Sequence, residues 1–249
     1  MRVATIALSF ALIIPNPLPA SPHLHRPPQQ PTPSTATPTL QQSLAILVGN
    51  ASLTDVTLTG SVRRIAGSDD ESGTATLKAL SAGSARADLS LSSGPLSEIQ
   101  NLSSATPAGE WSGPDGVAHP IAFHNLLAEP AWFFPTFAIA RRLSSGYTVT
   151  DLGPTTHNGQ QIEHFSVSQN STIISPPSAP SSQHLTEVDF YLDSATAVPA
   201  AITFDVHPDN NALLDIPVEV RFSDFRSVSG VQIPFHIQKF FLTLPSTIS

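Results

Sequence analysis

The last third of the chain alternates apolar and polar residues in four consecutive runs between His184 and Phe241. Successive side chains of a strand point to opposite faces, so each run is expected to have one apolar and one polar face. The pattern predicts four antiparallel strands whose apolar faces share a hydrophobic interior. The apolar positions are Val188, Phe190, Leu192, Ile202, Phe204, Val206, Val218, Val220, Phe222, Val231, Ile233, Phe235 and Ile237.

Weaker alternation precedes this block and brings the expected total to about eleven strands. A short helix is expected over 40–48, because apolar residues recur there at helical spacing and Gly49-Asn50 provides a stop signal. The polar stretch 67–73 is expected to be the turn between the first two strands. The predicted strands cover 54–66, 73–80, 84–92, 96–103, 109–113, 146–152 and 160–169.

The stretch 119–144 interrupts the strand pattern with a cluster of aromatic residues. Pro130 and Pro135 break its continuity, so two or three short helices are expected instead of one long helix. The chain is therefore predicted to be mainly β, in an α+β arrangement with a helical insert after the fifth strand.

The N-terminus has the features of an export signal. Met1-Arg2 precedes an apolar stretch from Val3 to Ile14, and Leu18-Pro19-Ala20 offers a small residue for cleavage. Such a stretch is too short to span a bilayer as a helix, so 1–20 are predicted to be a signal peptide and no membrane span is expected after its removal; the alternative is a buried helix of the mature fold. Residues 21–38 form a Pro-rich linker, and 39–249 are expected to form one domain. The protein is thus expected to be periplasmic or secreted.

Composition narrows the functional classes. Only 12% of the residues are charged and the formal net charge is −8, which argues against a nucleic-acid partner. The chain has no Cys, which excludes disulfides, thiol catalysis and a Cys-containing zinc site. Neither a Gly-x-Ser-x-Gly elbow nor a Gly-rich phosphate loop occurs, so no enzymatic activity and no cofactor is expected.

The segment from Pro217 to Phe235 carries the sequence Phe-Ser-Asp-Phe-Arg-Ser-Val-Ser-Gly-Val-Gln-Ile-Pro. It is similar to a hairpin that recurs in the superfamily of the periplasmic lipoprotein carrier LolA. The resemblance extends over about 40–242 and implies an incomplete, curved antiparallel β-barrel with short helices covering its concave, hydrophobic face. A flat sandwich of two sheets is the alternative.

Two local expectations follow for this C-terminal segment. The change of phase between Phe222 and Phe225 predicts a β-bulge at Ser223-Asp224. The resemblance also implies a further hairpin and closing strand, which do not follow here. The C-terminus is therefore interpreted as truncated or diverged, and the strand over 230–242 is expected to be an unprotected edge.

The aromatic cluster of the insert is the strongest candidate for a ligand surface. Four such rings amount to roughly 600–1,000 Å², more than the roughly 300–600 Å² that a monomer usually leaves exposed in its largest patch. The rings must therefore be covered by the sheet, by a partner or by a ligand. Ordinary core packing is the alternative to a ligand-binding role. The predicted ligand-binding residues are Trp132, Phe133, Phe134 and Phe137 of the insert and Phe190, Phe204 and Phe222 of the strand block.

The remaining polar residues have simpler interpretations. No metal site is predicted, because no spacing among the nine His residues supports one; convergence of histidines from separate strands is the alternative. The carboxylates Glu187, Asp189, Asp193, Asp205, Glu219 and Asp224 are expected on a solvated sheet face. His207-Pro208-Asp209-Asn210-Asn211 is predicted to be a turn. Arg141-Arg142 is expected either to compensate a helix dipole or to meet an anionic head group.

Two main functional hypotheses remain, and a hydrolase with an unrecognised site is a third. The first is a non-enzymatic binding protein or carrier for a hydrophobic small molecule or a lipoprotein acyl chain. The second is an interaction module without a cavity, which binds another protein of the cell envelope through an edge strand.

Overall fold

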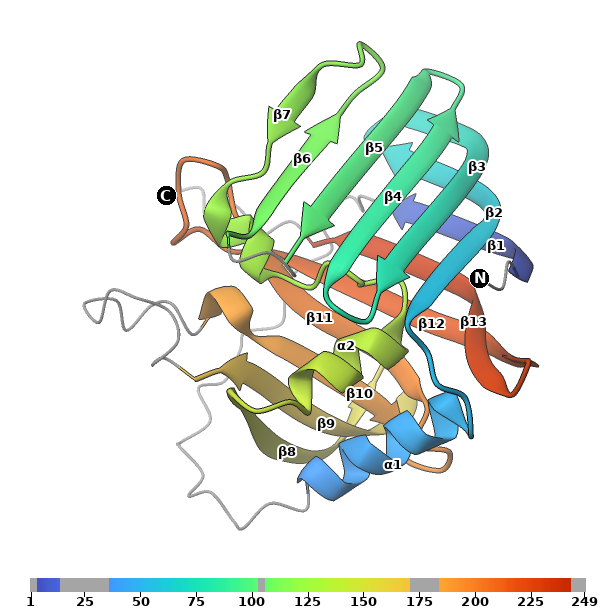
Figure 1. The fold of residues 1–249 in the computed structure, drawn as a ribbon, viewed down its shortest axis with the longest axis vertical. Coiled ribbons are helices and arrows are strands. Elements are labelled where there is room, and N and C mark those ends of the chain that lie inside the picture. The colour runs from blue at the N-terminus through green and yellow to red at the C-terminus, as the bar shows by residue number, and fades with distance from the viewer. Residues whose placement is uncertain (1–3, 14–35, 103–105, 171–183, 243–249) are drawn as a thin grey trace.

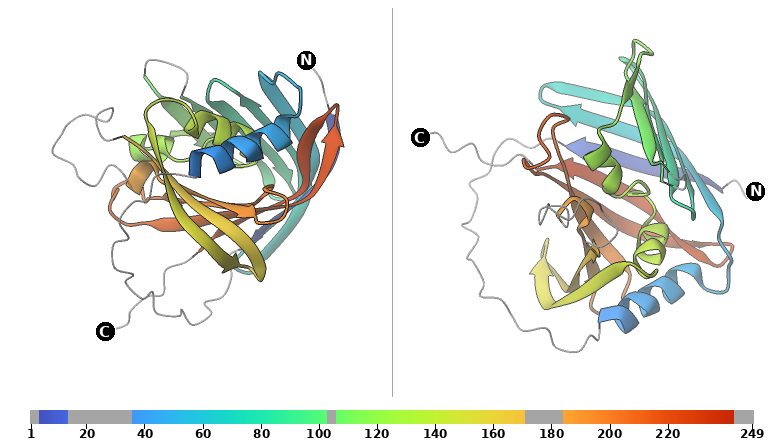
Figure 2. Two further views of the ribbon diagram at one scale, coloured as in Figure 1. Left: turned by 90° about the horizontal axis from the view of Figure 1, so that it is seen from below. Right: turned by 60° about the vertical axis from the view of Figure 1, so that its left-hand side comes forward.

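The computed structural model describes residues 4–13, 36–102, 106–170 and 184–242. Thirteen strands form one continuous sheet in the order β7-β6-β5-β4-β3-β2-β1-β13-β12-β11-β10-β9-β8. The sheet is strongly curved, and the helices lie on its concave side (Figures 1 and 2). No helix in the described part of the chain has the length and apolarity that a membrane span requires.

The first part of the sheet is an antiparallel meander that matches the weak alternation of the N-terminal half. Its strands are β2 (Asp55–Ala66), β3 (Asp69–Leu80), β4 (Ser84–Leu91), β5 (Gly94–Asn101), β6 (Ala108–Ser112) and β7 (Ala118–Pro120). The expected seven-residue turn over 67–73 is wrong, because β3 already begins at Asp69 and only Gly67 and Ser68 form the turn. The acidic residues after this turn belong to the strand, where Asp70 and Glu71 form cross-strand ion pairs with Arg63 and Arg64.

The second part of the sheet contains the strands of the strong alternation. They are β8 (Tyr147–His157), β9 (Gln160–Gln169), β10 (Val188–Asp193), β11 (Pro199–Val206), β12 (Ile216–Val228) and β13 (Val231–Phe241). All neighbours are antiparallel. The predicted bulge at Ser223-Asp224 is wrong: the register runs from Ser223 opposite His236 to Phe225 opposite Pro234 without an inserted residue. The irregularity is instead a left-handed backbone at Asp224, with φ of 54°.

The two parts are joined by β1 (Ala4–Ile13), which lies parallel to both β2 and β13. The apolar N-terminal segment is therefore a strand here, and the alternative of a buried helix is not what the structure shows. With β1 in place, the strand over 230–242 is not the expected edge, because β13 has β1 on one side and β12 on the other. The edges of the sheet are β7 and β8. β1 and β7 account for the difference from the expected eleven strands.

Four helical segments of the described residues lie against this sheet. They are α1 (Ala36–Val48), the 3₁₀ turn η1 (Phe123–Leu127), α2 (Pro135–Arg142) and the 3₁₀ turn η3 (His184–Thr186). The domain thus begins slightly before the expected Thr39; of the predicted linker, 21–35 lie outside the described residues. Pro135 occupies the first turn of α2, where a missing N–H costs nothing. Buried residues of α1 and α2 join those of both strand groups in one hydrophobic core.

Candidate functional site

The concave side of the sheet contains an apolar cavity of about 290 Å³. Its walls come from β2 to β6, from the end of β13 and from the segment that precedes α2. The volume lies near the lower limit of ligand pockets, which hold roughly 300–1,000 Å³. The lining residues are Val62, Arg64, Leu77, Ala87, Leu89, Leu96, Ser97, Glu98, Trp111, Ser112, Trp132, Lys239 and Phe241.

A second cavity of about 210 Å³ adjoins the first. Five residues line both: Glu98, Trp111, Trp132, Lys239 and Phe241. The second cavity is more polar and continues toward η1 and the end of β11, where it meets Asn125 and His207. The two together form an interior that is apolar at one end and polar at the other.

Lys239 lies at the junction of these cavities. Its ammonium nitrogen is 4.3 Å from the ring centre of Trp132 and 5.3 Å from that of Phe241, both within the range of cation–π contact. It forms no ion pair with a carboxylate of the described residues. Burial lowers the pKa of Lys239, and the charge of Glu98 acts in the opposite direction. The junction therefore holds a cation with aromatic contacts and room for an anion.

Lys239 was not among the predicted ligand-binding residues, although the alternation of apolar and polar residues places it on the inner face of β13. β13 points Ile233, Ile237 and Phe241 inward, and a period of two places Lys239 on the same face. A lysine at an inward position of an otherwise apolar strand is costly unless it has a function or a partner. This signal was available from the alternation alone.

The predicted ligand-binding residues separate into two groups. Trp132 lines the first cavity, and Phe204 lines the second. The remaining five rings are buried in the hydrophobic core and line neither of these two cavities: Phe133, Phe134, Phe137, Phe190 and Phe222. Phe134 and Phe137 contact each other edge to face, with ring centres 4.8 Å apart. Most of the aromatic cluster thus holds the insert against the sheet.

A buried ion network anchors the same insert. The carboxylate of Glu129 accepts hydrogen bonds from the Arg141 and Arg142 guanidinium groups and from the Ala131 N–H. Arg142 and Glu129 are almost fully buried, and burial lowers the pKa of Arg142 to about 10. Both arginines therefore pair with Glu129. Neither of the two expected roles of Arg141-Arg142 included this partner. Glu129 also lines the second cavity.

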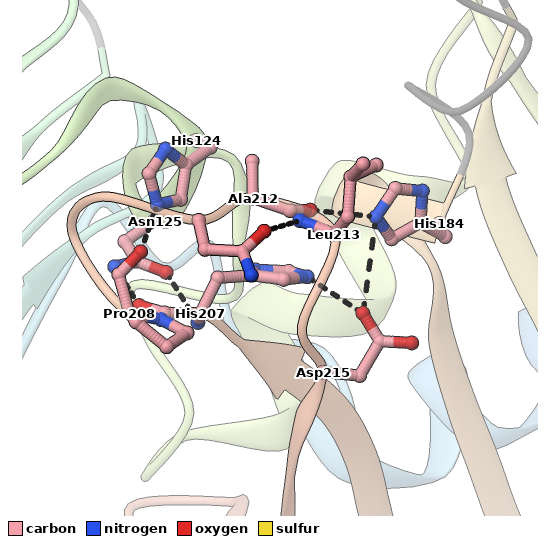
Figure 3. Close-up of polar contacts among 9 residues, drawn as sticks. His124, Asn125, His184, His207, Pro208, Ala212, Leu213 and Asp215 are labelled. Carbon is pink, nitrogen blue, oxygen red and sulfur yellow. Dashed lines mark hydrogen bonds and ion pairs between the residues drawn. The ribbon is translucent and has the colours of Figure 1, made fainter.

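A histidine cluster lies at the polar end of the second cavity (Figure 3). His207 Nε2 is 3.0 Å from Asp215 Oδ1, and His184 Nε2 is 3.8 Å from the same oxygen. His207 is buried, and this burial lowers its pKa against the opposing effect of Asp215. His124 packs edge-on against His207 with ring centres 5.7 Å apart. Three histidines that are distant in sequence are thus neighbours.

Part of this cluster follows from strand register. Val206 pairs with Ile216 at the end of the β11–β12 ladder, so the next cross-strand pair is His207 and Asp215. The predicted turn after His207 is present as the loop that returns the chain to β12. His184 approaches from η3, and no spacing in the sequence indicates that contact.

The expected solvated carboxylates are not all solvated. Glu219 is buried, because the β8–β9 turn brings His157 and Asn158 to its carboxylate at 2.8 Å each. Burial raises the pKa of Glu219, but the hydrogen bonds from His157, Arg221 and Asn158 outweigh it and lower the value to about 2. Asp205 differs, since burial and the charges of Asp215 and Glu187 raise its pKa to about 6.

Comparisons with known proteins give matches among solved structures alone. No family model matches the chain. No curated protein matches it either. A LolA superfamily protein from Nitrosomonas europaea is similar at a TM-score of 0.46 and 10% identity, over 86% of this chain and 88% of that one.

Two further structures have a comparable likeness. A domain described as of the outer membrane lipoprotein-sorting type, from Vibrio parahaemolyticus, has a TM-score of 0.43 at 12% identity, over 79% of this chain and 80% of that one. A DUF1329 family protein from Desulfovibrio piger has a TM-score of 0.42 at 7% identity, over 80% and 83%.

The chain is thus similar in its course to these three structures, at low sequence identity. The prediction of an incomplete, curved antiparallel barrel with helices on its concave face is confirmed by the strand order and by the position of α1 and α2. The likeness concerns the course of the chain and says nothing about a ligand, so the chemistry of the site depends on the residues described above.

Proposed function

We propose that the protein is a non-enzymatic carrier of an amphipathic lipid-type ligand. An acyl chain would occupy the apolar cavity, and an anionic end group would lie at Lys239. The observation that supports this most strongly is a cation that forms no ion pair with a carboxylate of the described residues, at the border of an apolar space.

The energetics favour a ligand with both features. Each buried methylene contributes about 0.8 kcal/mol, so a chain of several carbons supplies most of the affinity. A carboxylate or phosphate next to Lys239 adds a charge-assisted hydrogen bond in surroundings of low polarity. Trp132 would move aside or stack along the chain, since its ring contacts Lys239 and lines the cavity. A free fatty acid and a lipoprotein acyl chain differ in their end groups. The fatty alcohol used in the test below has no charged end group, so it separates the contribution of the acyl chain from that of the end group.

The test is a binding titration with a fluorescent fatty acid and the matching fluorescent fatty alcohol. Lys239→Met keeps the length of the side chain and removes the charge. We expect it to weaken binding of the acid about tenfold or more, as hydrogen bonds to charged groups are worth about 1.5–3 kcal/mol, and to leave the alcohol nearly unchanged.

Lys78→Met is the matched control, because Lys78 is an exposed lysine of β3 outside both cavities. Equal losses for acid and alcohol would contradict the role of Lys239. Absence of saturable binding of either probe to the unmodified protein would contradict the carrier function itself.

A second candidate is a protein-interaction module. β8 is an eleven-residue edge strand, and among the described strands it pairs with β9 alone, so its outer backbone groups are open to another strand. Mass spectrometry of lipids extracted from the purified native protein separates the two candidates. A stoichiometric lipid supports the carrier, whereas lipid-free protein that captures an envelope protein through β8 supports the module.

We also propose that the protein is exported, to the periplasm or the exterior. Cleavage after Ala20 would remove β1 and leave a vacant position between β2 and β13. The ten residues of β1 are thus either part of a cleaved signal peptide or a strand of the thirteen-stranded sheet. N-terminal sequencing of the protein recovered from outside the cytoplasm decides between them: a first residue of Ser21 supports export, and an intact Met1 contradicts it.

A further inference from the structure

We propose that His184, His207 and Asp215 form a binding site for a divalent transition-metal ion of the Zn²⁺ class. The site is separate from the apolar cavity and does not depend on a lipid ligand. Imidazole nitrogens and a carboxylate oxygen are donors that zinc accepts, and three protein ligands leave one coordination position for water or another molecule.

The distances are close to those that a metal ion requires. The three donor atoms lie within 4.8 Å of one another, with 3.0 Å from His207 Nε2 and 3.8 Å from His184 Nε2 to Asp215 Oδ1. Tetrahedral zinc, with bonds of about 2.0–2.2 Å, places its ligand atoms about 3.3–3.5 Å apart. Shifts of a few tenths of an ångström in the side chains of His184 and Asp215, which are both partly exposed, bring the oxygen contacts to that spacing.

The position of His207 is fixed before any ion arrives. Asn125 of η1 accepts a hydrogen bond from the His207 N–H at 2.8 Å and donates one to the His207 carbonyl oxygen at 2.7 Å. His124 Nε2 lies 3.1 Å from the Pro208 carbonyl oxygen and holds the following residue. Figure 3 shows these contacts on one side of His207 and Asp215 on the other. A ligand held in place in this way loses little freedom on binding.

The charge around the cluster favours a cation. His184 also borders a small cavity of about 160 Å³ whose walls include Glu187, Asp189 and Asp205. Among the described residues, no Lys or Arg forms an ion pair with these carboxylates or with Asp215. A group of carboxylates without Lys or Arg partners raises the local concentration of cations. The small cavity thus offers an approach to His184.

The apo cluster has hydrogen bonds that the metal must replace. His184 Nε2 lies 3.0 Å from the Ala212 carbonyl oxygen, and binding an ion at that nitrogen breaks this contact. His207 Nδ1 is buried and has no hydrogen-bond partner among the described side chains and backbone. Metal-bound histidines usually have such a second partner, whose loss costs about 10–100-fold in affinity. Micromolar binding is therefore expected instead of the tighter binding of a structural zinc site.

Calorimetric titration of the full, untagged chain with Zn²⁺ tests the site. His23 and His25 are replaced by Gln in every protein compared, so that the N-terminal histidines do not contribute. We expect one ion per chain, and an affinity at least tenfold weaker in His184→Ala and in Asp215→Asn. His119→Gln is the matched control, because His119 stacks on Trp111 away from the cluster and its replacement should change nothing.

Replacement of zinc by Co²⁺ gives a readout that a purely structural role would not change. The proposal predicts the visible absorption of four-coordinate Co²⁺ in the unmodified protein and its loss in His184→Ala. Circular dichroism confirms that each variant is folded. Absence of saturable Zn²⁺ binding, or an unchanged affinity in either ligand variant, would show that the cluster is a hydrogen-bonded one and would overturn the proposal.

Discussion

The two six-stranded parts of the sheet share one pleated pattern and differ in the size of the side chains on their inner faces. The inner face of β3 and β4 is rich in small residues, namely Ala75, Ala79, Ala85 and Ala87. The inner face of β9 to β12 is filled by large ones, including Phe165, Phe190, Ile202, Phe204 and Phe222. The apolar cavity lies over the first part, and α2 packs over the second.

This difference shows that alternation and volume are separate properties of a strand. Alternation decides which face turns inward, while the summed volume of the inward side chains decides whether the interior is filled. A sheet of this curvature with large residues throughout would have a solid core. Small residues on one half leave a space that the insert covers only at its border, through Trp132.

The largest expected effect compares a leucine of each part. Leu192→Ala removes a side chain that is 1% exposed in the filled part, and we expect a loss of about 2–5 kcal/mol in the free energy of unfolding. Leu89→Ala removes a partly buried side chain that already borders the cavity, and its expected cost is below about 2 kcal/mol.

Urea denaturation measures both values, and equal slopes with denaturant show that the unfolded states are comparable. Equal losses in the two variants would mean that the first part is as tightly packed as the second, and the comparison would fail.

The sequence predicted which face of most strands turns inward, but it predicted less about which strands pair with each other. Alternation predicted Val188 to Leu192 and Ile202 to Val206 correctly, because these runs have large β-branched and aromatic residues on a period of two. It missed β7, which is three residues long, and the place of β1, whose pairing joins segments more than 200 residues apart. Pairing over such separations leaves no local pattern in the chain.

The residues of the candidate site also divide into those that the sequence can reveal and those that it cannot. Trp132 belongs to an aromatic cluster that stands out in the sequence, and Lys239 could have been found from its inward register. Glu129 and His184 could not, since each acquires its role from a residue on another element: Glu129 from Arg142, and His184 from Asp215. A residue whose role depends on a partner from another element is recognisable in a sequence only when that partner is also known.

The next prediction adds volume to each part instead of removing it. Ala138→Leu adds three carbon atoms to the fully buried face of α2, which should cost about 1–3 kcal/mol by overpacking. Ala87→Leu places the same atoms into the apolar cavity, where space exists. We expect its stability to stay within about 0.5 kcal/mol of the unmodified protein.

The two variants should also differ in ligand uptake. Ala87→Leu is expected to reduce the amount of bound fluorescent fatty acid because it occupies part of the cavity, while Ala138→Leu should reduce uptake only as far as it unfolds the protein. If Ala87→Leu destabilised the chain as much as Ala138→Leu, the cavity would not be an available space.

The smallest effect concerns the outer face of the filled part, where Glu219 has its pKa lowered to about 2. His157, Asn158 and Arg221 contact this carboxylate. A carboxylate whose pKa is lower in the folded state stabilises the fold above its ordinary pKa and loses this contribution as the pH falls toward the folded value. We therefore expect the free energy of unfolding to fall between about pH 4.5 and pH 2. Glu219→Gln should show a shallower fall, and at neutral pH it should cost about 1 kcal/mol.

Thermal unfolding across this pH range measures the slope. Asp224→Asn is the control, because its ion pair with Arg226 is exposed and screened by solvent, so its slope should stay close to that of the unmodified protein. Identical slopes for Glu219→Gln and the unmodified protein would show that the outer face of the filled part is as solvated as the alternation of its residues predicted.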